Sequence, residues 1–254
     1  MKKNIFLILI ILSNCFCNAQ NTFKLVRKQT FEKDVFLGYD THKNLFAITN
    51  NQLLKITADK EIAYANYSFG KIHAVDISNP LKIIIFYKDF NNIVIVDNQL
   101  NEREIIQVDY DIDFSSNGIS DNIWLITSNF KRIQNYNFKT KKVISNSPPI
   151  TLKNIKNVKS NANNIYLQNK DGIYTYDYLG NLLDSLRFNK INDFQRFKNT
   201  FYISTQNEIY KVAADKSILL ILSHSNIVNF EIINGDFYIF DGKELSQYST
   251  KTNK

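Results

Sequence analysis

Glycine and proline are scarce in this chain, with 7 and 3 among 254 residues, which excludes collagen-like and linker-rich architectures. Both cysteines, Cys15 and Cys17, lie near the start of the chain, so the remainder has neither a disulfide framework nor a thiol nucleophile. Charged residues make up 22% and apolar residues 44%, which is too weakly charged and too apolar for a disordered protein. The sequence is therefore that of a chain that folds around an apolar core.

Long apolar runs are also absent. Lys2 and Lys3 precede an unbroken apolar run over residues 5–12, and a short polar stretch then ends in Asn18-Ala19-Gln20. This pattern predicts a secretory signal peptide at 1–19 and a single exported domain at 20–254, periplasmic or extracellular. The run is well short of the roughly 20 residues that span a bilayer, and no later run is longer, so we expect no transmembrane segment in the mature chain. An uncleaved N-terminal anchor is the alternative.

The same segment contains a second signal. Leu12-Ser13-Asn14-Cys15 resembles a bacterial lipobox, in which the cysteine is lipidated, although Asn before the cysteine departs from that pattern. Lipidation of Cys15 therefore stays open as an alternative to secretion without an anchor.

Basic residues exceed acidic ones only modestly. Removing Lys2 and Lys3 from the 31 Lys and Arg leaves 29 against 24 Asp and Glu, and these charges are scattered between apolar residues. No stripe of positive charge follows one face, so nucleic acid is not an expected partner.

The strongest signal in the sequence is an internal repeat. Six segments pair an aromatic or large aliphatic residue with a following aliphatic one or Ala, at intervals of 38, 40, 42, 36 and 36, and they begin at Phe46, Ile84, Trp124, Tyr166, Tyr202 and Tyr238. A second column of apolar residues precedes each segment: Val35, Ile72, Ile112, Ile155, Ile191 and Ile227. Another apolar pair follows each segment, and a further apolar run follows each of the first five units. Each unit thus supplies four short strands.

Turn residues separate the two central strands of every unit: Asn50-Asn51, Asn91-Asn92, Ser128-Asn129, Asp171-Gly172, Gln206-Asn207 and Asp241-Gly242. Asn, Asp and Gly tolerate the left-handed backbone of tight hairpin turns, so the many Asn residues offset the few glycines. Runs such as 83–86 and 237–240 are apolar at every position, as expected for strands covered on both faces. The pattern predicts an all-β, six-bladed β-propeller with four antiparallel strands in each blade.

The sixth unit ends near Ser249 and lacks an outer strand. The unclaimed N-terminal run 22–29 can supply it. We therefore expect Phe23 to Arg27 to pair with the C-terminal blade and to close the ring, which removes free sheet edges.

Six hairpin-based units covering nearly the whole mature chain resemble the six-bladed propellers of the NHL-repeat and TolB-like superfamily. The resemblance is architectural only, because no Asn-His-Leu signature and no Trp-Asp blade ending occur. It implies a fold and no functional residues. The ending Asn18-Ala19-Gln20, with the Asn-, Ile- and Lys-rich composition, also resembles exported proteins of Bacteroidetes type.

Catalytic motifs are absent from the sequence. The three histidines, His42, His73 and His224, lack zinc-binding spacing, and no Gly-x-Ser-x-Gly elbow or phosphate-binding glycine loop occurs. We therefore assign no catalytic residues.

Polar residues do interrupt the predicted innermost strands, which border the central channel. The candidate binding residues there are His73, Asp76, Asp113, Asn192, Asn229 and Glu231. Oxygen ligands of this kind suit a hard cation such as calcium, and six-bladed propellers of the lactonase type hold one at this place. His73 is the candidate general base in that interpretation. A water-filled channel needs a polar lining in any case, so the metal is left unknown and no cofactor is expected.

Two functions from different classes remain. The first is a secreted or periplasmic propeller, expected to be a monomer, that binds or scaffolds another envelope or secreted protein through its loops. The alternative is a calcium-dependent, lactonase-like hydrolase with its site at the channel mouth. A passive envelope component held by lipidated Cys15 is a third interpretation.

Overall fold

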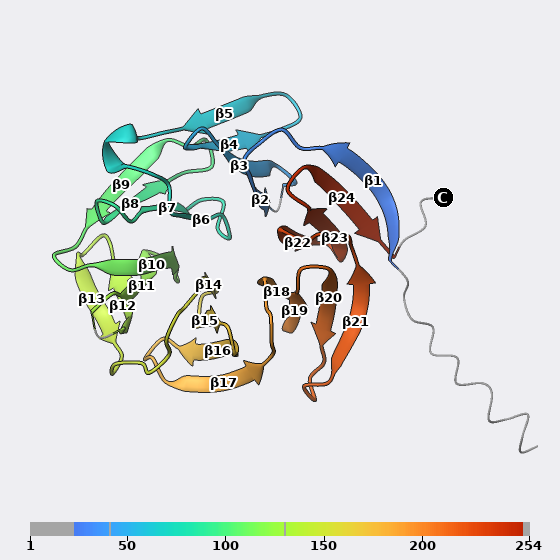
Figure 1. Ribbon diagram of the computed structural model, residues 1–254. Coiled ribbons are helices and arrows are strands. Elements are labelled where there is room, and N and C mark those ends of the chain that lie inside the picture. The colour runs from blue at the N-terminus through green and yellow to red at the C-terminus, as the bar shows by residue number, and fades with distance from the viewer. Residues whose placement is uncertain (1–22, 41, 130, 251–254) are drawn as a thin grey trace, which may run out of the picture.

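The computed structural model describes residues 23–40, 42–129 and 131–250. The predicted signal peptide and Cys15 lie outside these residues. Over the described residues the chain forms six separate four-stranded antiparallel sheets that surround a central channel (Figure 1). The predicted six-bladed β-propeller is therefore confirmed. One short 3₁₀ helix, η1 (Tyr67–Phe69), accompanies the strands of the described part.

The innermost strand of each blade borders the channel (Figure 1). These strands are β2 (Val35–Tyr39), β6 (Ala74–Asp76), β10 (Ile112–Asn117), β14 (Asn157–Ser160), β18 (Asp193–Phe197) and β22 (Asn229–Ile233). The second strands are β3 (Leu45–Thr49), β7 (Ile83–Tyr87), β11 (Asn122–Thr127), β15 (Asn164–Asn169), β19 (Thr200–Ser204) and β23 (Asp236–Phe240).

The third strands are β4 (Gln52–Ile56), β8 (Asn92–Val96), β12 (Ile133–Asn137), β16 (Gly172–Asp177), β20 (Glu208–Val212) and β24 (Glu244–Ser249). The outer strands are β5 (Glu61–Tyr64), β9 (Glu102–Gln107), β13 (Lys142–Asn146), β17 (Leu182–Arg187), β21 (Ile218–Ser223) and, from the start of the chain, β1 (Lys24–Thr30). We number the blades 1 to 6 from the one that contains β2. The upper end of the ring is the end at which the innermost strands begin. Outer strands run the opposite way and begin at the lower end.

The ring closes as the sequence predicts. β1 pairs antiparallel with β24, from Lys24 opposite Ser249 to Thr30 opposite Glu244, so the sixth blade combines both ends of the domain. The strand continues three residues beyond the predicted Arg27. Phe31 and Phe36 then pack with Phe240 across the junction of blades 6 and 1.

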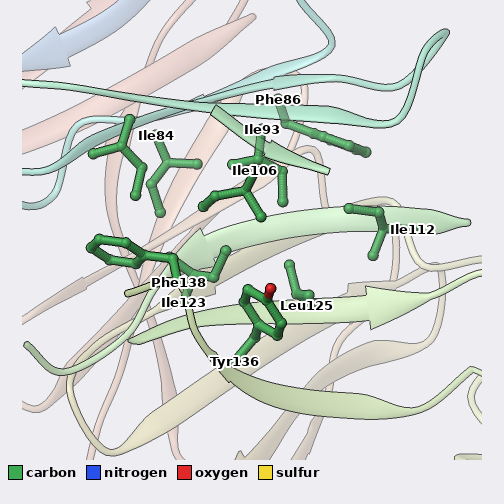
Figure 2. Close-up of a cluster of buried hydrophobic side chains, with 10 residues drawn as sticks. Ile84, Phe86, Ile93, Ile106, Ile112, Ile123, Leu125, Tyr136 and Phe138 are labelled. Atoms are coloured by element: carbon green, nitrogen blue, oxygen red, sulfur yellow. The ribbon is translucent and has the colours of Figure 1, made fainter. Parts of the chain in front are cut away.

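The core consists of apolar clusters between neighbouring blades. Between blades 2 and 3, Ile84 and Phe86 of β7 face Ile123 and Leu125 of β11 (Figure 2). All ten residues of β7 and β8 are buried, which explains why nine of them, all but Asn92, are apolar without alternation. Full burial of each such side chain contributes about 1.5–3 kcal/mol relative to exposure.

A buried lysine also joins blades 2 and 3. Lys82 Nζ donates to the carbonyl oxygens of Gly118, Ser120 and Asn122, at 2.9, 2.6 and 2.8 Å. Burial lowers the pKa of Lys82 to about 8, although the negative charge of Asp76 opposes the shift. A single ammonium group of blade 2 thus donates hydrogen bonds to three backbone carbonyl oxygens of blade 3.

Four of the six predicted turns form by two routes. Asn50, Asn51, Asn91 and Gly242 have the positive φ that a tight turn requires, at 49, 61, 54 and 99°. Neither Asp171 nor Gly172 has a positive φ; there the side-chain oxygen of Asn169 accepts hydrogen bonds from both backbone N–H groups, at 2.8 and 3.1 Å.

Candidate functional site

The central channel is a cavity of about 830 Å³ lined by the innermost strands. Five of the six residues proposed from the sequence line it: His73, Asp76, Asn192, Asn229 and Glu231. They do not form one group. Because innermost strands run downward, Asn192 and Asn229 lie at the upper mouth, where β18 and β22 begin, whereas Asp76 is the last residue of β6 and lies at the lower end.

Asp113 is not part of the channel lining. The pairing of β10 with β11 shifts register between Ile112 and Phe114, and a bulge of this kind redirects the side chain of the extra residue. Asp113 instead contacts Lys131 Nζ at 2.6 Å and Lys88 Nζ at 3.0 Å. Burial favours a higher pKa for Asp113, but the hydrogen bonds from Lys131, Lys88 and Ser128 outweigh it and lower the pKa to about 2. Asp113 therefore forms ion pairs with two lysines beside the channel.

Asp76 is held firmly at the lower end. Its carboxylate accepts hydrogen bonds from Ser116 Oγ at 2.6 Å, the Asn117 N–H at 2.8 Å and the Ser78 N–H at 2.9 Å. Burial alone would raise the pKa of Asp76, but these hydrogen bonds outweigh it and lower the pKa. Ser116 in turn contacts Ser160 Oγ at 2.7 Å, so the network joins blades 2, 3 and 4.

Glu231 is the least satisfied acid in the channel. Gln195 Nε2 donates to Glu231 Oε2 at 3.2 Å, and the Ile232 N–H donates to Oε1 at 3.3 Å. Burial raises the pKa of Glu231 to about 7; the positive charge of Lys159 opposes the shift, and the negative charge of Asp193 adds to it. Lys159 forms an ion pair with Asp193 at 3.2 Å, which leaves Glu231 without a cation of its own.

His73 lies exposed at the upper mouth, where its ring contacts Phe86 and Phe114. Burial against its neighbours and the positive charge of Lys88 lower the pKa of His73, so the imidazole is neutral at pH 7.

A second hollow opens on the upper end of blade 5. It has a volume of about 900 Å³ and is lined by the connections that follow β17, β19 and β21, over residues 188–192, 205–208 and 226–228, together with Tyr210. Asn192 and Val228 line both hollows, so the groove runs into the mouth of the channel. We call the groove and the channel mouth together the upper recess.

The lining of the upper recess is rich in amides. Asn189, Asn192, Gln206 and Asn226 contribute to it, with Lys190 and Glu208 adding one charge of each sign. Asn192 Nδ2 donates to the Ile227 carbonyl, and Asn226 Nδ2 donates to the Asp241 carbonyl at 2.7 Å, so these two amides brace the loops. Asn189, Lys190 and Gln206 are exposed. The sequence pointed to Asn192 alone among these residues, because the groove exists only where loops of two blades meet.

Neither a metal-binding group nor a membrane-spanning helix is found among the described residues. Within residues 23–40, 42–129 and 131–250, no three His, Cys, Asp or Glu side chains are grouped so that they could hold a metal ion. None of the helices in that part of the chain is long and apolar enough to cross a bilayer.

No protein-family model matches the sequence, and no curated protein matches it. Solved structures do match the fold. A streptogramin B lyase superposes with a TM-score of 0.60 at 10% identity, covering 91% of this chain and 99% of the lyase. BamB from Moraxella catarrhalis gives a TM-score of 0.51 at 12% identity, covering 83% and 68% of the two chains. BBS1N, solved in complex with ARL6DN, gives 0.59 at 9% identity, covering 92% and 98%.

These structures share the fold and little sequence. They match the fold of this chain, whose six blades are defined by its own sheets. At identities this low they define the class of fold alone, and any function must be argued from the surface of this chain.

Proposed function

We propose that this protein is an exported propeller of the cell envelope that binds an extended segment of another protein in the upper recess. The observation that carries the proposal is the continuity of the groove on the upper end of blade 5 with the channel mouth at Asn192. A hollow lined by amides fits a polypeptide, whose N–H and C=O groups need both donors and acceptors.

The acids of the channel favour this proposal over the hydrolase alternative. Asp113 lies beside the channel with two lysines, and Asp76 is already bound by three donors at the lower end. A shared calcium ion needs several oxygen ligands that converge at one place. Glu231 and Asn229 are the two predicted residues that come from one strand, β22.

The folds of BamB and BBS1N are consistent with a protein partner in general, since BBS1N is solved in complex with ARL6DN. Export is supported by the signal-peptide pattern at 1–19. Lipidation of Cys15 stays a prediction, and mass spectrometry of the mature N-terminus distinguishes acylated Cys15 from a chain that begins at Gln20.

The test is photo-crosslinking in cells. A photoreactive residue at Gln206 should form one discrete adduct, and the same residue at Asp59, on the exposed lower turn of blade 1, should not. Combining the probe with Asn189→Ala and Lys190→Ala should reduce the adduct at least fivefold, since these exposed side chains border Gln206 in the groove. Equal adducts from Gln206 and Asp59, or no adduct from Gln206, would contradict the proposal.

A further inference from the structure

The outer strands of blades 4 and 5 expose a group of large apolar side chains. Seven of them are between 41% and 56% exposed: Tyr178, Leu179, Leu182, Leu183, Ile218, Leu219 and Leu220. The two strands are joined at this place, because Lys216 Nζ contacts Asp184 Oδ1 at 2.6 Å and the Ser185 carbonyl at 3.3 Å. We call these seven residues the outer apolar patch. Contiguous exposed apolar surface of this kind marks a contact with another molecule or with a membrane.

The patch lies at the lower end of the ring. Its residues occupy the starts of β17 and β21 and the turn before β17, whereas the upper recess is lined by the loops that follow the ends of these strands. Six residues of extended chain separate the two ends by about 20 Å. The patch and the recess are therefore distinct surfaces at opposite ends of the ring.

On both sides of the patch, exposed aliphatic residues lie next to basic residues that form no ion pair with another described residue. On blade 3, Val143 and Ile144 follow Lys141 and Lys142, and Ser145 Oγ donates to the Tyr178 carbonyl, which joins this segment to the patch.

On blade 6, Leu25 and Val26 lie between Lys24 and Arg27, all of them exposed. Among the described residues none of Lys24, Arg27, Lys141 and Lys142 forms an ion pair, so four cations are free to meet negative charge. The negative charges nearby are fewer than these cations: Asp184 pairs with Lys216, which leaves Asp177 and Asp215, whose carboxylates accept backbone hydrogen bonds within their own turns.

The start of the described chain meets this surface. Phe23 packs on Phe237 with ring centroids 4.8 Å apart, in a cluster that also contains Ile221 and Leu222 of β21. Eight residue steps separate Phe23 from Cys15, and an extended chain of that length spans at most about 29 Å. Any anchor carried by residues 5–15 would therefore hold blades 5 and 6 close to a membrane.

We propose that the outer apolar patch and its basic flanks form a lipid-contacting surface for a bilayer with anionic headgroups. The aliphatic side chains enter the boundary between headgroups and acyl chains, and the four cations contact the headgroups. This arrangement needs no catalytic step, and it turns the upper recess away from the bilayer, toward a partner. It is independent of the recess as a binding site, since the two surfaces share no residue.

The test places a fluorescent label on single cysteines in the full chain, with Cys15 and Cys17 replaced by Ser so that no lipid anchor can form. The label is attached at Leu219→Cys in the patch, or at Ile105→Cys, which is similarly exposed on β9 of blade 2. Vesicles of phosphatidylcholine, with and without phosphatidylglycerol, are added together with an aqueous quencher.

The label at position 219 should shift to shorter wavelength and escape the quencher on vesicles with phosphatidylglycerol, while the label at position 105 stays accessible. Leu183→Ser with Lys141→Ala and Lys142→Ala should weaken vesicle binding by at least tenfold, as expected from the loss of one buried leucine and two charges. Because all three positions are exposed, an unchanged melting temperature confirms that these variants fold.

Two outcomes would overturn the proposal. In the first, the label at position 219 stays accessible to the quencher on every vesicle, or responds in the same way as the label at 105. In the second, position 219 becomes protected only when envelope proteins are added, which would assign the patch to a protein partner.

Discussion

Blades 2 and 5 have the same four-stranded plan but place their apolar residues differently. In blade 2 the two central strands, β7 and β8, are buried at every position, and the outer strand β9 begins with Glu102, Arg103 and Glu104. In blade 5 the central strands β19 and β20 are only partly buried, and the outer strand β21 exposes Ile218, Leu219 and Leu220.

This difference in burial separates apolar residues that stabilise the fold from apolar residues that face solvent. The apolar residues of blade 2 are accounted for by packing between blades, and the charges on β9 protect a free sheet edge from association. The exposed aliphatic residues of β21 contribute little to packing and leave an edge without charge over Ile218–Ser223. The apolar residues of blade 2 thus stabilise the ring, whereas blade 5 carries, at its upper and lower ends, the two surfaces that we propose for contacts with a protein and with lipid.

The largest expected effect tests this division directly. Phe86→Ala in blade 2 should lower the free energy of unfolding by about 3–5 kcal/mol, because it opens a cavity in a fully buried cluster. Leu219→Ala in blade 5 should change it by less than about 0.5 kcal/mol. Urea denaturation of the two variants measures both values, and comparable losses would show that the exposed residues of β21 are structural after all.

The next effect concerns the link between blades 2 and 3. Lys82→Met should cost about 2–4 kcal/mol, because three carbonyl oxygens lose the ammonium that they share. The matched control is Lys139→Met, on the exposed turn of blade 3, which should leave the unfolding midpoint nearly unchanged. A Lys82→Met protein as stable as this control would show that the carbonyls find other donors.

A smaller effect comes from two acids of the channel, Asp76 in blade 2 and Glu231 in blade 6, whose pKa values shift in opposite directions. Glu231 has a folded pKa raised from 4.5 to about 7, so its contribution to stability is complete below pH 4.5 and is lost as the pH rises to 7. Glu231→Gln should therefore raise the melting temperature by about 3–5 °C at pH 8 and by much less at pH 4.5.

Asp76→Asn provides the contrast of opposite sign. The pKa of Asp76 is lowered in the fold, so its stabilisation is present above the unfolded pKa and is lost as the pH falls. Thermal scans from pH 4.5 to 8 should show Asp76→Asn less stable than the original chain at neutral pH. If both variants followed the same pH profile, the different environments described for the two carboxylates would be wrong.

The smallest expected effect is that of calcium. Because Asp76 lies at the lower end and Asp113 beside the channel, millimolar calcium should shift the melting temperature by less than about 1 °C. A shift of several degrees, abolished by Glu231→Gln, would restore the calcium-dependent interpretation of the channel mouth.

The sequence was sufficient to predict the ring and its closure. Apolar residues that recur at regular intervals can be recognised without knowledge of tertiary contacts. The last unit lacked an outer strand, and the N-terminal run was the one segment not yet assigned to a strand, so it was expected to complete that unit. The apolar residue predicted to open the innermost strand, such as Ile72, lies two positions before that strand begins in four of the six units. Strand boundaries are commonly uncertain by one or two residues.

The surfaces were harder to predict. Asp113 was predicted to line the channel because it is a polar residue within a predicted innermost strand, and the bulge in β10 cannot be seen in the sequence. The upper recess depends on how loops of adjacent blades meet, which no repeat period reports. The apolar run that follows the fifth unit, residues 218–222, was predicted to be a strand, but only the structure shows that its first three residues are exposed.

The pairing of β1 with β24 has a consequence for biogenesis. These strands come from opposite ends of the domain, so the strand that is synthesised first must wait for the one that is synthesised last. During synthesis blades 1 to 5 can assemble in order, but the sixth blade stays incomplete until β24 has been made. Until then β1 has no partner strand, and its exposed edge can pair with other chains.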